Sequence, residues 1–221
     1  VKTLVTMETK GVLYHAYPSR STRVLWALYE ANLEESFRVV VTKFGVSNPE
    51  LVSANPLATV PTLTINTIHN GTTTTINLIE TSSILYWLQD NGNLKKNNDK
   101  VCSAYQHNWM AISACTLDPV LYQVFEHTIL LAEEKRDQTV LARAKEKLCK
   151  ILDMLEAHLK GFGPWICGED FQLVDCIVGG ELQFTVDIKA LELENRFPVC
   201  HGYLERCRGR NAFKKAYVKP Q

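Results

Sequence analysis

The sequence has no long apolar run, no excess of charge of either sign, and no cysteine in its first hundred residues. A helix that crosses a bilayer needs about 20 consecutive apolar residues, and no apolar run approaches that length. Lys plus Arg count 24, Asp plus Glu count 24, and the formal net charge is +0. Such a balance disfavours a protein that covers a nucleic-acid backbone or an anionic membrane. We therefore expect neither a membrane nor a nucleic acid as a partner.

Motifs for metals, nucleotides and secretion are also missing. The six histidines show no H-x-x-x-H or H-E-x-x-H spacing, and there is no G-x-G-x-x-G or phosphate loop. The seven cysteines are odd in number and form no C-x-x-C pair, which fits neither a disulfide framework nor a zinc site. The segment before residue 12 lacks the basic and apolar regions of a signal peptide. These absences predict a cytoplasmic protein with reduced cysteines and no metal; whether residues precede Val1 stays open.

Strand and helix signals alternate over the first part of the chain. Residues 12–17 read as a short strand that runs into a Pro-Ser turn. Apolar side chains then recur at helical spacing over residues 24–31, with Ser19 or Ser21 able to cap the start of the helix and Asn32 able to end it. Phe37, Val39 and Val41 recur at every second position, which indicates a second strand over residues 37–41. The opening is therefore a βαβ unit, whose two strands must run parallel if they share one sheet.

A hairpin and a helix complete this part of the chain. Residues 62–65 and residues 75–78 read as strands, and Asn70-Gly71 between them is a strong hairpin signal. A helix is expected over residues 81–89. The order β-α-β, then β-β-α, fills about eighty residues.

The segment of residues 91–100 is polar and lacks apolar anchors, as is typical of a linker. Beyond it the signals are helical: over residues 140–159 the apolar side chains fall on one face of a long helix. Further helices are expected over residues 175–190 and 199–207. We expect a first domain at residues 9–90, a linker at residues 91–100, and an all-helical domain at residues 101–221.

The segment over residues 13–28 carries the most specific pattern. It reads LYHAYPSRSTRVLWAL, in which a Ser-Arg-x-x-Arg pattern leads into an apolar helix. This segment resembles the opening strand, catalytic loop and first helix of serine-type cytosolic members of the glutathione transferase superfamily, theta-like or fungal-bacterial-like. In that pattern the catalytic Ser lies four residues before the helix Arg, which maps onto Ser19 before Arg23. Ser21 and Tyr17 are the alternates, since other classes place a catalytic tyrosine at the strand end.

The chemistry of a thiol explains this residue type. A cysteine thiol has a pKa of about 8.5 and reacts as the thiolate, so an enzyme that uses glutathione must favour the anion near neutral pH. Lowering a pKa by about two units requires about 2.7 kcal/mol, and one hydrogen bond to a charged group supplies about 1.5–3 kcal/mol. A Ser hydroxyl at a helix N-terminus therefore suffices. The lack of cysteine before Cys102 excludes the cysteine-type loop of omega-like and glutaredoxin-like members.

Two more segments resemble the glutathione-binding loops of the family. Residues 55–63 end in Val60-Pro61 before a strand; the resemblance implies a cis proline and pairing of the Val60 backbone with the cysteinyl part of glutathione. Ala58 and Thr59 stand where Gly and Lys are common in the family.

Glu80-Thr81 resembles the family's Glu-Ser pair at a helix start. The carboxylate would pair with the γ-glutamyl ammonium, while the hydroxyl and the helix N–H groups would hold its carboxylate. A merely capped helix with an acidic first turn explains the same two residues.

The resemblance extends into the second half of the chain. Residues 171–175 resemble the family's capping box, with Gln172 in place of Ser or Thr, and we assign them to folding. Residues 108–119 match the helix that lines the acceptor pocket of similar transferases. Its acceptor-facing residues would be Trp109, Met110, Ser113 and Leu117, although helical spacing suits core positions equally well.

We therefore expect an α/β plus all-α chain: a thioredoxin-like βαβ-ββα domain followed by an all-helical domain, the glutathione transferase fold. The resemblance implies a homodimeric glutathione S-transferase whose thiolate attacks small hydrophobic electrophiles, as in detoxification, with glutathione as co-substrate and no other cofactor. Two alternatives stay open. One is a non-catalytic interaction module like the elongation-factor gamma subunit. The other, motivated by Thr59, is a transferase or peroxidase that uses a modified glutathione thiol.

Overall fold

The computed structural model describes residues 10–69, 71–94, 97 and 99–218. The chain divides into two compact units: the first holds residues 1–94 with 215–221, and the second holds residues 95–214. The helix before the expected linker ends at Asn91, and the next begins at Lys100. The chain end from Lys215 onward groups with the first unit, whereas the sequence placed it in the helical domain.

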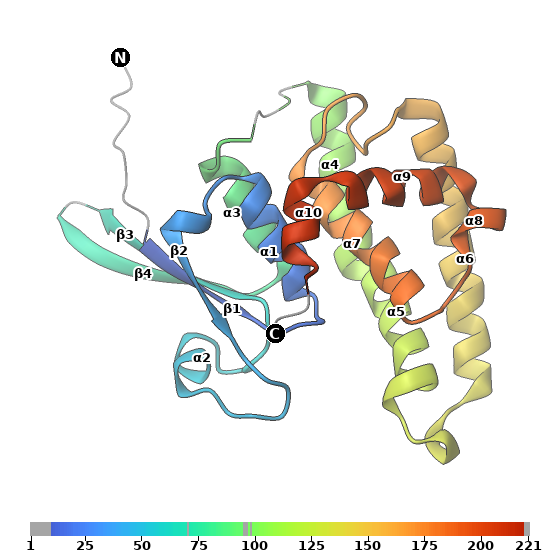
Figure 1. Ribbon diagram of the computed structural model, residues 1–221, viewed down its shortest axis with the longest axis horizontal. Coiled ribbons are helices and arrows are strands. Elements are labelled where there is room, and N and C mark those ends of the chain that lie inside the picture. The colour runs from blue at the N-terminus through green and yellow to red at the C-terminus, as the bar shows by residue number, and fades with distance from the viewer. Residues whose placement is uncertain (1–9, 70, 95–96, 98, 219–221) are drawn as a thin grey trace. The chain divides into compact units, whose positions relative to one another are not determined.

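The first unit is built on a four-stranded mixed sheet of order β2-β1-β3-β4 (Figure 1). β1 pairs parallel with β2 and antiparallel with β3, while β3 and β4 form an antiparallel hairpin. The parallel opening pair and the hairpin are those the sequence predicts; Asn70 of the predicted turn lies outside the described residues. The strands are β1 (Lys10–His15), β2 (Phe37–Val41), β3 (Thr62–His69) and β4 (Thr72–Leu78).

Helices connect these strands and complete the core of the first unit. Leu13 lies directly opposite Leu63 in the β1–β3 register, and both side chains are fully buried. Because alternate strand residues share a face, Ile65 joins them, and the buried apolar side chains of α1 and α3 complete this core. The helical elements are α1 (Ser21–Glu30), a 3-10 turn at Glu34–Ser36, α2 (Pro49–Ala54) and α3 (Thr81–Asn91).

The second unit is helical, as predicted. Apart from one bridge between Trp165 and Gly168, its described residues form no strand pairing. Its elements include two π-helical turns, Ser113–Leu117 and Glu126–Leu130, and a 3-10 turn at Glu133–Lys135. The α-helices are α4 (Lys100–Ile112), α5 (Asp118–Phe125), α6 (Gln138–Phe162), α7 (Leu173–Asp187), α8 (Leu193–Arg196), α9 (Pro198–Gly209) and α10 (Asn211–Ala216), whose last two residues belong to the first unit.

A buried carboxylate organises the start of α7. Asp175 Oδ2 accepts a hydrogen bond from the Gln172 backbone N–H at 2.8 Å. Its Oδ1 accepts from the Ile166 N–H and from the Tyr203 hydroxyl, both at 2.9 Å. Burial raises the pKa of Asp175 to about 6, although these donors favour the charged form. The folding role expected for this segment therefore rests on Asp175, which joins three separate stretches of chain.

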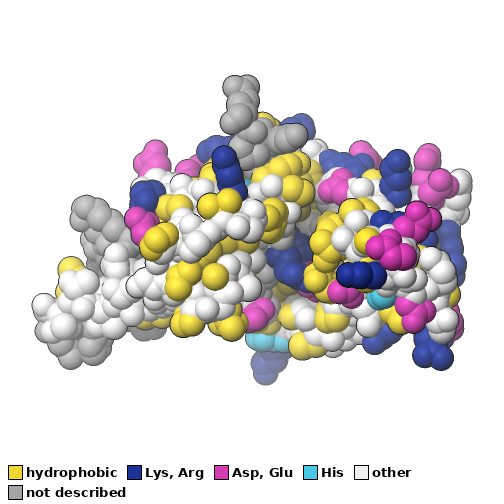
Figure 2. Space-filling view, turned by 90° about the horizontal axis from the view of Figure 1, so that it is seen from below, with side chains coloured by type: hydrophobic (Ala, Val, Ile, Leu, Met, Phe, Trp, Pro, Cys, Tyr) yellow, Lys and Arg dark blue, Asp and Glu magenta, His cyan; other side chains and the backbone are white. Residues whose placement is uncertain are grey.

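The surface and the thiols agree with the composition. On the face shown in Figure 2, Lys and Arg side chains are interspersed with Asp and Glu side chains. All seven cysteines are free, and all but Cys115 are buried. Among the described residues, no helix combines the length and the apolarity required to cross a membrane.

Candidate functional site

The loop between β1 and α1 places two serines next to each other. β1 ends at His15 and α1 begins at Ser21, with Arg20 at the N-cap position and no side-chain cap. Ser19 therefore lies in the loop rather than at the cap, and its side chain is partly exposed, whereas Ser21 is fully buried. The partial positive charge of the helix N-terminus lies beside Ser19 and favours an anion there.

The two serine hydroxyls contact each other directly. Ser19 Oγ lies 2.6 Å from Ser21 Oγ, and it also accepts the Ser21 backbone N–H at 3.1 Å. Ser21 Oγ in turn accepts the Ala16 N–H at 3.0 Å and lies 3.2 Å from the Ala16 carbonyl oxygen. Of these two serines, Ser21 is fully buried and Ser19 is partly exposed.

The third candidate, Tyr17, is directed elsewhere. Its hydroxyl donates to the Tyr217 carbonyl at 3.4 Å, which is a long bond within the first unit. The peptide bond between Tyr17 and Pro18 is cis. Which of the three candidates meets a ligand thiol stays a prediction.

A buried histidine that sequence reasoning missed completes the loop. His15 Nδ1 lies 2.7 Å from Ser21 Oγ, and the side chain is 2% exposed. Burial lowers the pKa of His15 to about 4, so the imidazole is neutral near neutral pH. In the sequence His15 is one of six histidines without metal-type spacing, and no motif marks a contact to a serine six residues later.

Asn55 holds the loop that leads to Val60-Pro61. Its buried side chain donates through Nδ2 to the Thr59 carbonyl at 3.2 Å and to the hydroxyls of Thr59 and Thr62 at 3.0 Å each. Its Oδ1 accepts the Leu57 N–H at 3.0 Å. The bond between Val60 and Pro61 is cis, and Val60 lies just before the paired register of β3.

Ala58 and Thr59, the two residues that depart from the family pattern, lie in this loop. Ala58 has a φ of 52°, a left-handed conformation that glycine adopts without steric cost. This explains why glycine suits the position. Thr59 is exposed, and its hydroxyl accepts from Asn55, so its side chain supplies a hydroxyl rather than the cation that Lys would provide.

The start of α3 carries the Glu80-Thr81 pair. Glu80 occupies the N-cap position with no side-chain cap bond, and its side chain is exposed, while Thr81 is 7% exposed. The first turn of α3 contains no acidic residue. Glu80 therefore does not form the side-chain cap with an acidic first turn that the alternative requires. Its side chain is exposed.

Strand directions bring these three segments to one end of the sheet. Tyr14 lies opposite Thr62, and Leu63 lies opposite Leu78. Because both pairings are antiparallel, β1 ends, β3 begins and β4 ends on the same side. The serine loop, the Val60-Pro61 loop and the start of α3 therefore all leave the sheet there.

The predicted acceptor residues of the second unit are buried. Trp109 and Met110 lie in α4, and Ser113 and Leu117 lie in the π-helical turn that follows; each is at most 2% exposed. Trp109 packs against His158 of α6, with ring centroids 5.3 Å apart. These residues thus contribute to the core, and their contact with an acceptor stays a prediction.

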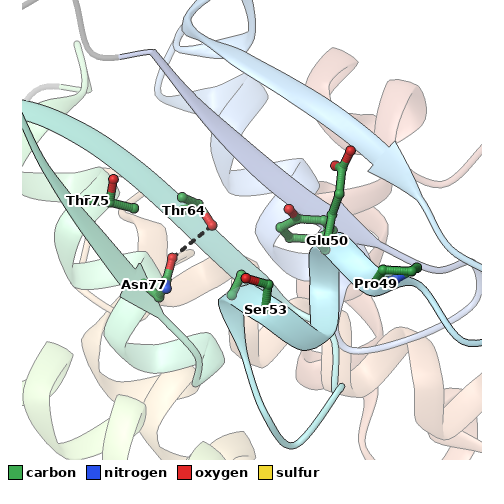
Figure 3. Close-up of a pocket in the computed structure, with 8 residues that line it drawn as sticks. Pro49, Glu50, Ser53, Thr64, Thr75 and Asn77 are labelled. Carbon is green, nitrogen blue, oxygen red and sulfur yellow. Dashed lines mark hydrogen bonds between the residues drawn. The ribbon is translucent and has the colours of Figure 1, made fainter.

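A separate open pocket of about 510 Å³ lies on the first unit, between α2 and the sheet (Figure 3). Thr64 Oγ1 donates to Asn77 Oδ1 at 2.9 Å across its floor. None of the predicted glutathione-binding or catalytic residues lines it. Its lining consists of Tyr14, Pro49, Glu50, Ser53, Ala54, Thr64, Thr75 and Asn77.

Comparisons with known proteins match both halves of the chain. A model described as the glutathione S-transferase N-terminal domain matches residues 18–91, and one described as the C-terminal domain matches residues 138–206. The chain is 31% identical over 173 residues to a glutathione S-transferase of Silene vulgaris, covering 73% of this chain and 76% of that relative.

Solved structures share the fold. A glutathione transferase family member from Pseudomonas fluorescens, with two glutathione bound, has a TM-score of 0.82 and 21% identity over 94% of this chain and 92% of its own. Ure2p in complex with glutathione has a TM-score of 0.79 and 18% identity over 94% of this chain and 97% of its own. The predicted thioredoxin-like domain followed by a helical domain is confirmed. This chain belongs to the glutathione S-transferase family.

Proposed function

We propose that this chain is a glutathione S-transferase in which Ser19 holds the glutathione thiolate for attack on a small hydrophobic electrophile. The observation that carries this proposal is Ser19, a partly exposed serine beside the start of α1. It lies at the end of the sheet from which the Val60-Pro61 loop and the start of α3 also emerge.

The energies available at this site match the task. Lowering the thiol pKa by about two units requires about 2.7 kcal/mol. A hydrogen bond from a hydroxyl to a charged sulfur contributes about 1.5–3 kcal/mol, and a helix N-terminus adds about 0.3–1 kcal/mol. Ser19 and α1 together can therefore stabilise the thiolate without a general base.

The rest of glutathione would bind to the other two segments. The Val60 backbone, outside the strand pairing, would take the cysteinyl main chain as an added strand does. The exposed Glu80 carboxylate would pair with the γ-glutamyl ammonium, and Thr81 with the first N–H groups of α3 would hold its carboxylate. In this proposal glutathione is the co-substrate, no further cofactor takes part, and the chain acts as a homodimer in the cytoplasm.

Binding to a glutathione-affinity column and conjugation of a dinitrobenzene electrophile test the proposal. The conjugation rate of the Ser19→Ala variant at neutral pH is expected to fall tenfold or more. A tenfold loss corresponds to about 1.4 kcal/mol of activation free energy. Ser47→Ala, an exposed serine in the loop after β2, is the matched control and should behave like the wild type. If the wild type neither binds nor conjugates, a non-catalytic interaction module becomes the better account.

The Thr59 loop favours a second candidate, a transferase or peroxidase that takes a modified glutathione thiol. Thr59 offers only a hydroxyl that Asn55 already engages, so it does not supply a cation for the glycine carboxylate. Turnover measured with glutathione and with thiols altered at that glycine distinguishes the two candidates. A higher kcat/KM for an altered thiol would favour the second.

A further inference from the structure

A continuous series of hydrogen-bonding atoms links His15 at the end of β1 to Ser21 at the start of α1 and to Ser19 in the loop between them. His15 Nδ1 lies 2.7 Å from Ser21 Oγ, and Ser21 Oγ lies 2.6 Å from Ser19 Oγ. His15 and Ser21 are buried, whereas Ser19 is partly exposed at the outer end. This hydrogen-bonded series thus runs from the protein interior to the position proposed for the thiolate.

Ser21 Oγ, the middle atom of the series, can accept only a limited number of hydrogen bonds. A serine hydroxyl donates one proton and accepts through two lone pairs. The Ala16 N–H, which is a fixed donor, occupies one lone pair of Ser21 Oγ. Only one lone pair is left, and it is filled either by an N–H of His15 or by the hydroxyl of Ser19.

The tautomer of His15 therefore decides the direction of the Ser19 proton. A neutral imidazole carries its proton on one nitrogen, and the other nitrogen accepts. If Nδ1 is bare, the Ser21 proton turns to His15, and Ser19 donates to Ser21 rather than to a ligand. If Nδ1 carries the proton, it fills the second lone pair of Ser21, and the Ser19 proton cannot be donated there.

We propose that His15 is a positioning residue that donates through Nδ1–H to Ser21 and so directs the Ser19 hydroxyl proton to the bound thiolate. In this state Ser21 donates its own proton to Ser19 Oγ or to the Ala16 carbonyl, both within reach. No bond to carbon or sulfur forms or breaks in this step. The inference rests on the proposed function, since it concerns the thiolate that Ser19 holds.

Burial supports this role for a neutral histidine. Because burial holds the pKa of His15 at about 4, the ring keeps one proton across the pH range in which a thiolate is formed. A donor hydroxyl that itself accepts from Ser21 is also more strongly polarised, as in other hydrogen-bond chains.

Two substitutions separate this role from a structural one. His15→Leu removes the donor, so Ser19 can again donate to Ser21; the pKa of bound glutathione should rise by about one unit, and kcat/KM at neutral pH should fall about tenfold. His15→Asn places an amide N–H where Nδ1 stands and should recover most of that loss. Affinity for S-methylglutathione, which has no thiolate, should change less than about twofold in either variant, which also shows that both variants fold.

The wild-type protein gives the deciding readout without any substitution at the site. NMR of protein labelled with ¹⁵N in its histidine rings identifies which His15 nitrogen carries the proton, and the signal is assigned by its loss in His15→Asn. With glutathione bound, Nδ1 should be the protonated nitrogen. Protonated Nε2 in the complex, or an unchanged thiol pKa in His15→Leu, overturns the inference.

The outcome also separates this inference from the proposed function. If Ser19→Ala raises the pKa of bound glutathione but His15→Leu does not, the function stands and the role of His15 is refuted. If the wild type does not bind glutathione, or if Ser19→Ala leaves the thiol pKa unchanged, both proposals are refuted.

Discussion

Replacing Asp175 by Asn tests the buried polar cluster of the second unit. The carboxylate accepts three hydrogen bonds, from Gln172 N–H at 2.8 Å and from Ile166 N–H and the Tyr203 hydroxyl at 2.9 Å. The amide of Asn offers one oxygen and one NH2 group, so at least one buried donor loses its acceptor and faces another donor. An unsatisfied buried donor costs about 1–3 kcal/mol, and we expect the free energy of unfolding to fall by about that amount near pH 4; near pH 7 the loss is smaller, because the neutral amide avoids the cost of a buried charge.

The pH dependence of this loss follows from the raised pKa of Asp175. The pKa rises from its ordinary 3.8 to about 6 on folding, so the folded chain binds more protons than the unfolded chain between these values. The wild-type free energy of unfolding should therefore fall as pH rises from about 4 to about 6, by roughly 1–3 kcal/mol. Asp175→Asn lacks this contribution, so the stability gap between wild type and variant is larger near pH 4 than near pH 7.

Urea unfolding followed by tryptophan fluorescence at several pH values measures both effects. Asp170→Asn, which changes an exposed acid in the segment just before α7, is the control, and its stability should stay within about 0.5 kcal/mol of the wild type. A stability gap that stays constant or widens as the pH rises would refute the argument from burial.

Three further predictions concern the first unit. Ala58→Gly should raise the free energy of unfolding by about 0.5–1 kcal/mol, because it relieves the left-handed backbone at φ 52°; the same change at exposed Ala157 in α6 should lower it by about 1 kcal/mol. Asn55→Ala frees the loop before Val60, so KM for glutathione should rise several-fold with kcat nearly retained, and a fall in kcat alone would contradict this. Tyr17→Phe removes only a long hydrogen bond, so its conjugation rate should stay within about twofold of the wild type, and a tenfold loss would instead make Tyr17 the catalytic residue.

Periodicity predicted most elements of the fold but not their polar ends. The strand at Phe37–Val41 matches the expected bounds, and the long helix α6 contains all of residues 140–159. The sequence pattern predicts the first strand at residues 12–17, but β1 ends at His15. The Ala16 N–H donates to the Ser21 hydroxyl instead of to a neighbouring strand. The pattern of apolar residues does not predict this hydrogen bond.

The start of α1 is predicted more closely than its cap. Apolar spacing over residues 24–31, with Ser19 or Ser21 as the expected cap, predicts a helix that begins close to Ser21, where α1 does begin; Arg20 occupies the N-cap position, without a side-chain cap bond. Apolar periodicity locates a helix by its apolar face, so it does not predict that the side chains of the first turn are buried polar ones.

Motifs indicate Ser19, the Val60-Pro61 loop and Glu80 as candidate site residues, and the strand directions explain why their segments leave the sheet at one end. His15 and Asn55 could not be found in this way. Each acts through side-chain hydrogen bonds to residues several positions away in irregular backbone, where spacing carries no periodic signal. Spacing alone also does not separate a pocket-lining face from a core face. Trp109 and Met110 have the spacing expected of a face that lines the acceptor pocket, and both side chains are buried.

The ionisation of bound glutathione tests the central claim most directly. The ultraviolet absorbance of the thiolate, titrated with pH in wild type, Ser19→Ala and Ser47→Ala, gives the pKa of the bound thiol in each. We predict a value about two units below the ordinary thiol value of about 8.5 in the wild type and in Ser47→Ala, and a rise of at least about one unit in Ser19→Ala. An equal pKa in the wild type and in Ser19→Ala would contradict the assignment of Ser19 as the residue that holds the thiolate.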